Sequence, residues 1–379
     1  MRHLYLHVPF CGRRCSYCDF SIAVRKRVPA HDYVAAVAGE LALVRAAALA
    51  PPSVGGLDTL YLGGGTPSAL PPDALAALLP VLFAAFHGAA PRDAVEVTLE
   101  ANPEDVTLDA ARAWRAAGIN RVSLGAQSFD DHVLAWMHRS HDAARTGAAV
   151  RALRAAGIVD ISLDLIFAVP EELGRDWARD LECAVALEPA HLSLYGLTVE
   201  ARTPLARWIS RGAASAPDDE RYAAEYLYAH ERLARDGYRF YEVSNAGRGG
   251  RRSRHNSAYW TERAYLGLGP AAHSFDGCTR RWNVAPWEAY RRAVRLGRLP
   301  RDAAETLTED QRELERRYLA LRTDQGLPVG LCAPERLRAW GGAGWVQVTG
   351  ERFRCTPEGW LRVDALVRDL TLRPDSVNC

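Results

Sequence analysis

Six short apolar runs, each followed by an amphipathic helical stretch, constrain the fold of this chain most strongly. The runs lie at residues 4–8, 57–62, 95–100, 121–124, 161–167 and 191–197. Helices between consecutive strands require crossover connections and therefore parallel pairing. Several such units in series favour a barrel that is closed or partly closed. Six units rather than eight predict an α/β fold with an incomplete (β/α)6 barrel over residues 1–236.

The chain after about residue 290 has a different pattern. Helical stretches at 309–321 and 334–340 precede two short strand candidates, 345–348 and 352–355, and a helix over about 358–370. Helices followed by a two-stranded wing predict a small α+β domain, similar to a winged helix, over residues 291–379. Residues 237–290 then form an extension between the two domains.

Three cysteines, Cys11, Cys15 and Cys18, stand within eight residues directly after the first apolar run. Thiolates suit iron–sulfur clusters, and a fully ligated four-iron, four-sulfur (4Fe-4S) cluster would take four of them. The CxxxCxxC spacing therefore predicts a 4Fe-4S cluster with one iron open to an exchangeable ligand.

Zinc and disulfides are the alternatives for these cysteines. Structural zinc sites usually close with four ligands in paired blocks. The other cysteines are instead scattered singly, at Cys183, Cys278, Cys332, Cys355 and Cys379. A disulfide framework is less favoured still, because the chain is long and no apolar signal segment precedes the first cysteine. We therefore expect reduced thiols and a cytoplasmic protein.

Composition excludes two classes of function. The formal net charge of +1 gives no bulk positive field to attract nucleic acid. No stretch approaches the roughly 20 uncharged apolar residues of a membrane span, since even the alanine-rich run after Tyr33 carries Glu40 and Arg45. We expect no nucleic-acid partner and no transmembrane segment, whereas peripheral association with a membrane stays open.

Distinctive residues follow the ends of successive predicted strands. The cysteines follow the first, GGGTP (63–67) the second, EANP (100–103) the third and GAQS (125–128) the fourth, and Asp164 lies within the fifth. The carboxyl ends of parallel barrel strands meet at one mouth, where loops form active sites. The glycines allow the backbone to approach a ligand, although a tight turn alone would also explain them.

Glu100, Gln127, Arg139 and Asp164 are the polar candidates near this mouth. A carboxylate there can accept hydrogen bonds from ribose hydroxyls or an ammonium, and an arginine can pair with a carboxylate. Each residue taken singly is equally compatible with a structural role.

The segment YLHVPFCGRRCSYCDF (5–20), together with GGGTP, EANP and LDLIFAVP (163–170), resembles the radical S-adenosylmethionine superfamily. More narrowly, the chain is similar to the group that contains oxygen-independent coproporphyrinogen III dehydrogenase and the haem chaperones. This resemblance extends from residue 4 to about 370 and implies a TIM-like partial barrel of the radical SAM type. It also implies that the open iron is chelated by S-adenosylmethionine, whose carbon–sulfur bond one electron can cleave.

The resemblance implies two sets of contacts to S-adenosylmethionine. The first set consists of Tyr5, Tyr17, Gly64, Gly65, Thr66 and Glu100. A second set matches positions that hold a second S-adenosylmethionine in the dehydrogenase, namely Gln127, Arg139 and Asp164.

Two departures favour the chaperones over the dehydrogenase. The dehydrogenase motif is CxxxCxxCxC, but Phe20 stands where its last cysteine would be. The dehydrogenase also carries a longer N-terminal extension, whereas only ten residues precede Cys11 here.

The positive sign of a chaperone is a segment that resembles the haem-binding signature HNxxYW of that group. The sequence HNSAYW occupies residues 255–260, so the resemblance assigns haem contacts to four side chains: His255, Asn256, Tyr259 and Trp260. An imidazole can ligate haem iron and aromatic rings can pack on the macrocycle. Four nearby arginines could pair with propionates, namely Arg248, Arg251, Arg252 and Arg254. A basic loop whose histidine hydrogen-bonds locally is the alternative. His273 is a secondary candidate ligand, for which a structural role is the favoured interpretation.

These signs predict a haem chaperone that binds haem, a 4Fe-4S cluster and S-adenosylmethionine. It would transfer haem to acceptor haemoproteins such as respiratory enzymes, with an electron donor for the cluster. The alternative is a coproporphyrinogen III dehydrogenase, which decarboxylates propionates oxidatively, and a third is a radical enzyme with another substrate.

Overall fold

A twelve-stranded sheet forms the centre of the molecule in a computed structural model that describes residues 1–49, 56–86 and 94–371. Six of its strands lie side by side in chain order and pair in parallel. They are β1 (His3–Val8), β4 (Thr59–Gly64), β5 (Glu96–Ala101), β6 (Arg121–Gln127), β7 (Asp160–Phe167) and β8 (His191–Gly196). This order confirms the predicted incomplete (β/α)6 barrel.

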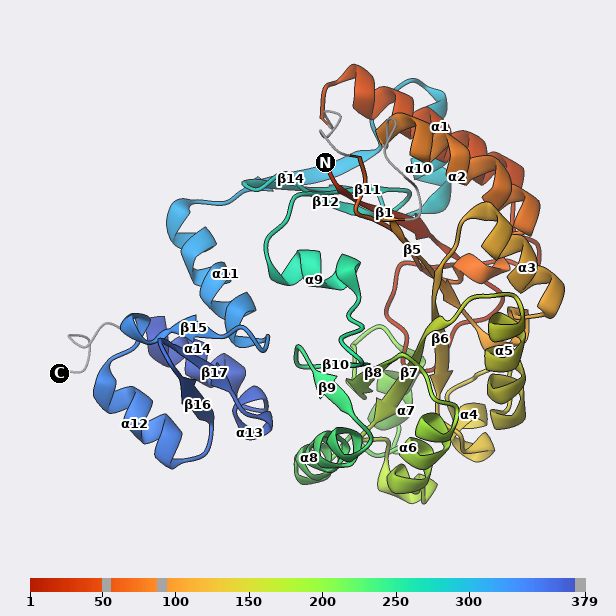
Figure 1. Cartoon of the computed structure of the whole chain (residues 1–379). Coiled ribbons are helices and arrows are strands. Elements are labelled where there is room, and N and C mark those ends of the chain that lie inside the picture. Colours follow the sequence, from red (N-terminus) through yellow and green to blue (C-terminus); the bar gives the residue numbers. More distant parts are fainter. Residues whose placement is uncertain (50–55, 87–93, 372–379) are drawn as a thin grey trace.

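Helices cover the convex face of these strands (Figure 1). The longer ones are α1 (Ala30–Ala46), α2 (Pro72–Phe86), α3 (Leu108–Ala117), α5 (Ala143–Ala155), α6 (Trp177–Ala186) and α8 (Asp219–Arg235). Two shorter helices, α4 (Asp131–Trp136) and α7 (Pro204–Ser210), pack beside the cysteine loop instead, in a separate apolar cluster. Leu4, Leu6 and Val8 of β1 are buried in the core with the longer helices. Because side chains alternate along a strand, Tyr5 and His7 point to the concave side.

Local signals set the helix ends. The Thr107 hydroxyl accepts a hydrogen bond from the Ala110 N–H at the start of α3. Gly118 ends that helix in the left-handed region, with φ of 107°. A side-chain acceptor at the first position and a glycine at the last are the usual helix caps, so the sequence itself limits this helix.

Six further strands extend the sheet at both edges, and the sequence pattern did not predict them. Beside β1 lie β11 (Tyr265–Leu268), which is parallel to it, and the antiparallel strands β12 (His273–Phe275), β13 (Thr279–Asn283) and β14 (Arg301–Thr306). Beside β8 lie β10 (Asn245–Arg248) and β9 (Tyr238–Phe240). These strands are short, and several are polar, so they lack the apolar run that marks a buried strand. Between them lie α9 (Arg254–Trp260) and α10 (Trp287–Arg295).

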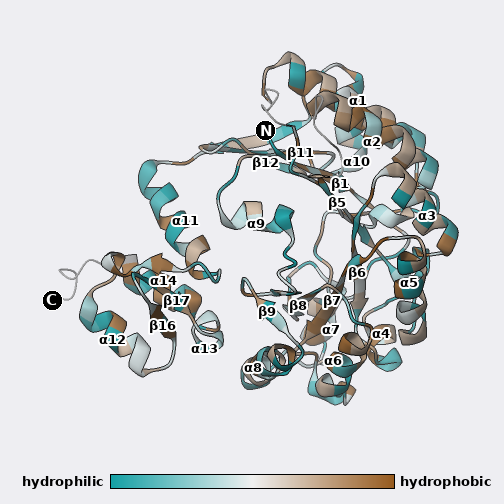
Figure 2. Ribbon diagram, in the orientation of Figure 1, coloured by the Kyte–Doolittle hydropathy of each residue, from teal (hydrophilic) through white to brown (hydrophobic). Residues whose placement is uncertain are grey.

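The C-terminal elements form a separate group to one side in Figure 1. They comprise α11 (Glu309–Leu321), α12 (Pro334–Gly342), α13 (Pro357–Trp360), α14 (Val363–Thr371) and the strands β15 (Leu327–Pro328), β16 (Val346–Thr349) and β17 (Arg352–Cys355). The strands pair in the order β15-β17-β16. The single helix predicted over 358–370 is wrong, because two helices occupy that segment. Figure 2 shows α11 as hydrophilic over most of its length.

The division of the chain at residues 236 and 290 and the winged-helix character of the last part stay predictions. The end of that part, residues 372–379 with Cys379, lies outside the described residues. No described helix combines the length and the hydrophobicity that crossing a lipid bilayer requires.

Candidate functional site

The cysteine loop contacts the loops that follow two other strands. Cys11 belongs to the short strand β2 (Phe10–Cys11), which pairs with β3 (Ala23–Val24). The Thr66 hydroxyl, just after β4, donates a hydrogen bond to the Cys11 sulfur at 3.3 Å. Arg139, beyond β6, donates to the Cys15 sulfur at 3.6 Å. The structure therefore brings these parts of the predicted mouth together at the carboxyl ends of the strands.

Arg139 is the polar centre of this mouth. Its guanidinium also donates to the Asn102 side-chain oxygen at 2.6 Å and to the Gly125 carbonyl at 3.0 Å. Its Nε is buried and has no partner among the residues that the structure describes. A buried N–H without a partner is costly, so this atom is a donor available to a bound group.

Burial makes two of the thiols weaker acids than an exposed cysteine. It raises the pKa of Cys11 to about 11 despite the hydrogen bond from Thr66, and it also raises the pKa of Cys18. Iron binds thiolate, so cluster binding has to release these protons. Within the described ranges, no three His, Cys, Asp or Glu side chains are placed to hold a single metal ion. A 4Fe-4S cluster differs from a single ion in that it takes each thiolate on a different iron.

Close contacts require glycine at the last position of β4, Gly64, and at the next position, Gly65. Gly64 has φ of +112°, and its N–H donates to a Glu100 carboxylate oxygen at 3.0 Å. A Cβ at Gly65 would lie 2.9 Å from backbone atoms of Pro9 and Phe10, the residues that lead into Cys11. Larger residues would displace the cysteine loop, so these glycines couple the second strand to the cluster site.

Glu100 and Asp164 are half-buried acids on the concave face. Glu100 also accepts a hydrogen bond from the Tyr61 hydroxyl at 2.8 Å, and burial raises its pKa to about 7. Asp164 lies within β7 rather than at its end and accepts a hydrogen bond from the Ser123 hydroxyl at 2.9 Å. Burial raises the pKa of Asp164 to about 6. Hydrogen bonds from neighbouring side chains therefore already satisfy the carboxylate of Asp164.

The remaining predicted contacts lie around this centre. Gln127 ends β6 with φ of +65° after a shift in register. Tyr17 packs on the apolar cluster that contains Met137. Tyr5 is on the concave face of β1, with its hydroxyl 3.2 Å from the His7 Nδ1. Phe20 is exposed.

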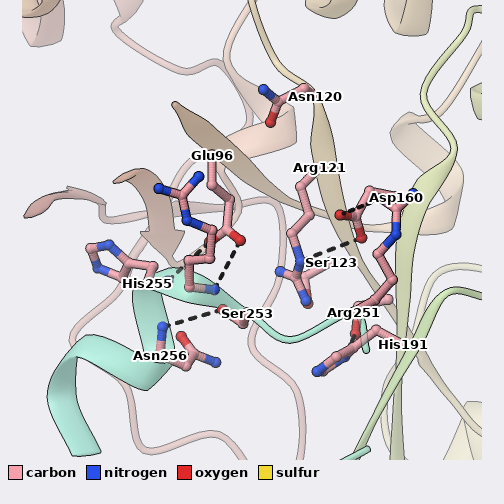
Figure 3. A network of polar contacts seen from close by, with 12 residues as sticks. Glu96, Asn120, Arg121, Ser123, Asp160, His191, Arg251, Ser253, His255 and Asn256 are labelled. Atoms are coloured by element: carbon pink, nitrogen blue, oxygen red, sulfur yellow. Dashed lines mark hydrogen bonds and ion pairs between the residues drawn. The ribbon is translucent and has the colours of Figure 1, made fainter. Parts of the chain in front are cut away.

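His255 lies at the opposite end of the strands. It is on α9, whose first backbone N–H groups donate to the carboxylate of Glu96, the first residue of β5 (Figure 3). Its Nδ1 is 2.7 Å from the hydroxyl of Thr59, the first residue of β4, and its Nε2 is 2.8 Å from the Tyr259 hydroxyl. Its ring is 1% exposed and stacks on Tyr61. Burial lowers its pKa to about 3.

Both imidazole nitrogens of His255 are therefore already hydrogen-bonded, and the ring is not presented to a ligand. Asn256 and Trp260 are half-buried on the same helix, and Ser253 caps it through the Asn256 N–H (Figure 3). This geometry agrees with the alternative in which the histidine forms local hydrogen bonds. Hydrogen bonds to Thr59 and Glu96 hold α9 at the amino ends of the strands.

The four arginines before and within α9 are also engaged. Arg251 pairs with Asp160 at 3.4 Å, Arg252 with Asp324 at 2.6 Å and Arg254 with Asp58 at 3.7 Å, whereas Arg248 lies over the Tyr238 ring. Propionates would have to compete with these partners.

A cavity of about 490 Å³ lies between the concave face of the sheet, α9 and α11. We call it the α9–α11 cavity. It is lined by Tyr5 and His7 of β1, Tyr259 of α9, and residues of β11–β13 that include Tyr265, His273 and Arg280. Sequence reasoning missed this cavity and the place of His7 in its lining. The alternation of His3, Tyr5 and His7 in an otherwise apolar strand was the available signal.

Comparison with known proteins agrees with this geometry. The model of the Radical SAM superfamily matches residues 5–184, which hold the cysteine loop, the glycines and Arg139. Fold and mouth together thus define a radical SAM protein, a class that implies a 4Fe-4S cluster and S-adenosylmethionine.

Full-length relatives narrow this class. The chain is 40% identical over 373 residues to Heme chaperone HemW of Mycobacterium tuberculosis, covering 97% of this chain and 94% of that protein. It is 32% identical to Heme chaperone HemW of Bacillus subtilis, over 86% of this chain and 85% of that one. The chain belongs to the HemW family.

A solved structure supports the fold. Coproporphyrinogen III oxidase (HemN) from Escherichia coli, described as a radical SAM enzyme, superposes with a TM-score of 0.80 over 97% of this chain and 89% of that chain. Sequence identity is 22%, so this likeness concerns the fold alone.

Proposed function

We propose that this protein is a cytoplasmic haem chaperone that binds haem and transfers it to acceptor haemoproteins such as respiratory enzymes. The observation that carries the proposal is the 40% identity, over 97% of the chain, to a protein named Heme chaperone HemW. The α9–α11 cavity supports it, because its volume of about 490 Å³ lies in the range of ligand sites and its lining includes the aromatic rings of Tyr5, Tyr259, Tyr265 and Phe275.

The mouth would hold the cluster and S-adenosylmethionine. Cys11, Cys15 and Cys18 would ligate the cluster, and the contacts to S-adenosylmethionine are those predicted from the sequence. When bound to a cluster that an electron donor has reduced, S-adenosylmethionine supplies one-electron cleavage of a carbon–sulfur bond. Arg139 positions Cys15 against Asn102 and Gly125, and its unpaired Nε offers a further donor.

The HNxxYW segment contributes to the haem side through Tyr259, which lines the cavity, while His255 orients that tyrosine by their hydrogen bond. Direct ligation of iron by His255 would require Nε2 to exchange the Tyr259 hydroxyl for the metal. This exchange would expose a ring that is now buried.

Anaerobic reconstitution followed by haem titration tests the proposal. We expect saturable haem uptake, read by absorbance, and transfer of that haem to an apo-haemoprotein such as apomyoglobin. The matched control is the same titration on a heat-denatured sample.

Two outcomes would contradict the chaperone assignment. One is the absence of haem uptake by the reconstituted protein. The other is robust anaerobic conversion of coproporphyrinogen III to a protoporphyrinogen-type product, which would favour the dehydrogenase.

A further inference from the structure

Three histidines lie on or behind the wall of the α9–α11 cavity, and their ring nitrogens differ in occupation. His255 uses both, with Thr59 and Tyr259. His7 also uses both, with the Tyr5 hydroxyl at 3.2 Å and the Ser21 carbonyl at 3.2 Å. For His273, no side-chain hydrogen bond is present within the described residues. Of these three histidines, His273 is therefore the one whose ring nitrogens are free to ligate the metal of a bound group.

His273 is also held in place at the cavity. It begins β12 and pairs in register with Trp282 of β13, and the two rings stack with centroids 5.7 Å apart and planes 22° apart. The residue is exposed and lines the cavity. Stacking fixes the plane of the imidazole while its edge stays open to solvent. An imidazole held in this way could ligate the iron of a bound haem.

The other walls suit a flat macrocycle. Tyr265 pairs with Phe275 in the sheet, so both side chains lie on the same face as His273. Tyr5 and Tyr259 close the cavity from β1 and α9. Aromatic rings on two sides provide a large apolar contact area for a planar ring system.

Within the part of the chain that the structure describes, one cation in the cavity lining has no partner. Arg280 forms an ion pair with Glu315, and Glu262 lies 3.7 Å from Arg316. Arg263 lines the same cavity, is exposed, and its guanidinium makes no ion pair or hydrogen bond with any described residue. The lining therefore leaves one positive charge for a carboxylate at the rim.

We propose that the α9–α11 cavity binds haem, with His273 rather than His255 as the iron ligand and Arg263 as the partner of a propionate. The proposal rests on the proposed function, because it names the ligand residues of the same haem site. Partial desolvation of the ring and the nearby charge of Arg280 lower the pKa of His273, which keeps its nitrogens available to iron at neutral pH.

Haem titration of four proteins tests the ligand assignment: wild type, His273→Ala, His255→Gln and His132→Ala. His132 is an exposed histidine on α4, distant from the cavity lining, and serves as the control. We expect His273→Ala to lose the imidazole-ligated absorbance spectrum and to weaken haem binding at least about tenfold. His255→Gln should keep the imidazole-ligated spectrum, although its affinity can change because Tyr259 loses its partner. His132→Ala should titrate as wild type, and thermal melts establish that each variant is folded.

Two further arms separate ligation from shape. Binding of iron-free protoporphyrin IX, read by fluorescence, should be unchanged in His273→Ala and weakened in Arg263→Glu. Added imidazole should restore the ligated spectrum of a His273→Gly variant. Rescue supports a ligand role, which a structural histidine would not show.

The possible failures are distinguishable. A wild-type spectrum in His273→Ala with its loss in folded His255→Gln overturns this assignment but leaves the chaperone function intact. Absence of haem uptake by the wild type overturns the proposed function itself.

Discussion

The polar groups at the two ends of the barrel strands differ in how completely they are hydrogen-bonded. At the carboxyl ends, the Arg139 Nε is buried without a partner in the described structure, and the nearby thiols have few donors. At the amino ends, Glu96 accepts from two backbone N–H groups of α9, and both nitrogens of His255 are bonded. Unsatisfied buried groups mark a place for a ligand, whereas satisfied ones mark an anchor. The HNxxYW motif, although conspicuous in the sequence, can therefore serve to anchor α9 to the sheet.

Replacing Cys15 by serine should have the largest effect of all, because it removes a cluster ligand at the carboxyl ends of the strands. Serine is a poor ligand for a cluster iron, so we expect iron after anaerobic reconstitution to fall from about four per chain to background. Iron analysis and the absorbance of the cluster measure this. Cys183→Ser, on α6 away from the mouth, should keep the wild-type iron content. Equal iron in both variants would contradict the cluster site.

Replacing His255 by alanine tests the anchor. The change leaves the hydroxyls of Thr59 and Tyr259 without partners and opens a cavity, so the free energy of unfolding should fall by about 3–4 kcal/mol. Chemical denaturation measures it. His132→Ala, at an exposed position, should change stability by less than about 0.5 kcal/mol. A wild-type stability for His255→Ala would show that the α9 contacts are not structural.

Glu40 refines the comparison between hydrogen-bonded and unpaired buried groups, because its carboxyl group has several hydrogen-bond partners and can still titrate. It accepts hydrogen bonds from the Gly269 N–H, Asn283 and Tyr290, and burial raises its pKa from 4.5 to about 7. Between these values the folded chain holds a proton that the unfolded chain has lost. Its contribution to stability is therefore present at low pH and falls by up to about 3 kcal/mol as pH rises to 7.

Glu40→Gln should remove this part of the pH dependence. Denaturation of wild type and variant at pH 5 and pH 7.5 isolates it, since the other buried acids are common to both proteins. Parallel pH dependences would contradict the assignment of the proton to Glu40.

Gly65→Ala is expected to have the smallest effect. The new Cβ would press on the backbone of Pro9 and Phe10, at a cost of about 1–2 kcal/mol, and it should reduce the iron retained by the neighbouring cysteines. Gly12 is the matched control, because a Cβ there meets nothing within 4 Å. Denaturation and iron content are read in parallel, and equal results for the two alanine variants would refute the contact.

The sequence alone determined the six parallel strands, their order and the position of the cysteine loop after the first one. These features follow from local patterns, namely apolar runs, helical spacing and three cysteines within eight residues. It also predicted the helix at 309–321 and the strand at 352–355 with the observed bounds.

Only the tertiary structure decided which histidine faces a cavity. His255 and Thr59 are 196 positions apart in the chain, and β11 adds to the sheet beside β1 although it comes last of all the parallel strands. Such contacts depend on how distant segments pack, and no local spacing encodes them. The motif HNxxYW therefore indicated the family, whereas the fold placed its histidine in an anchor and left His273 open.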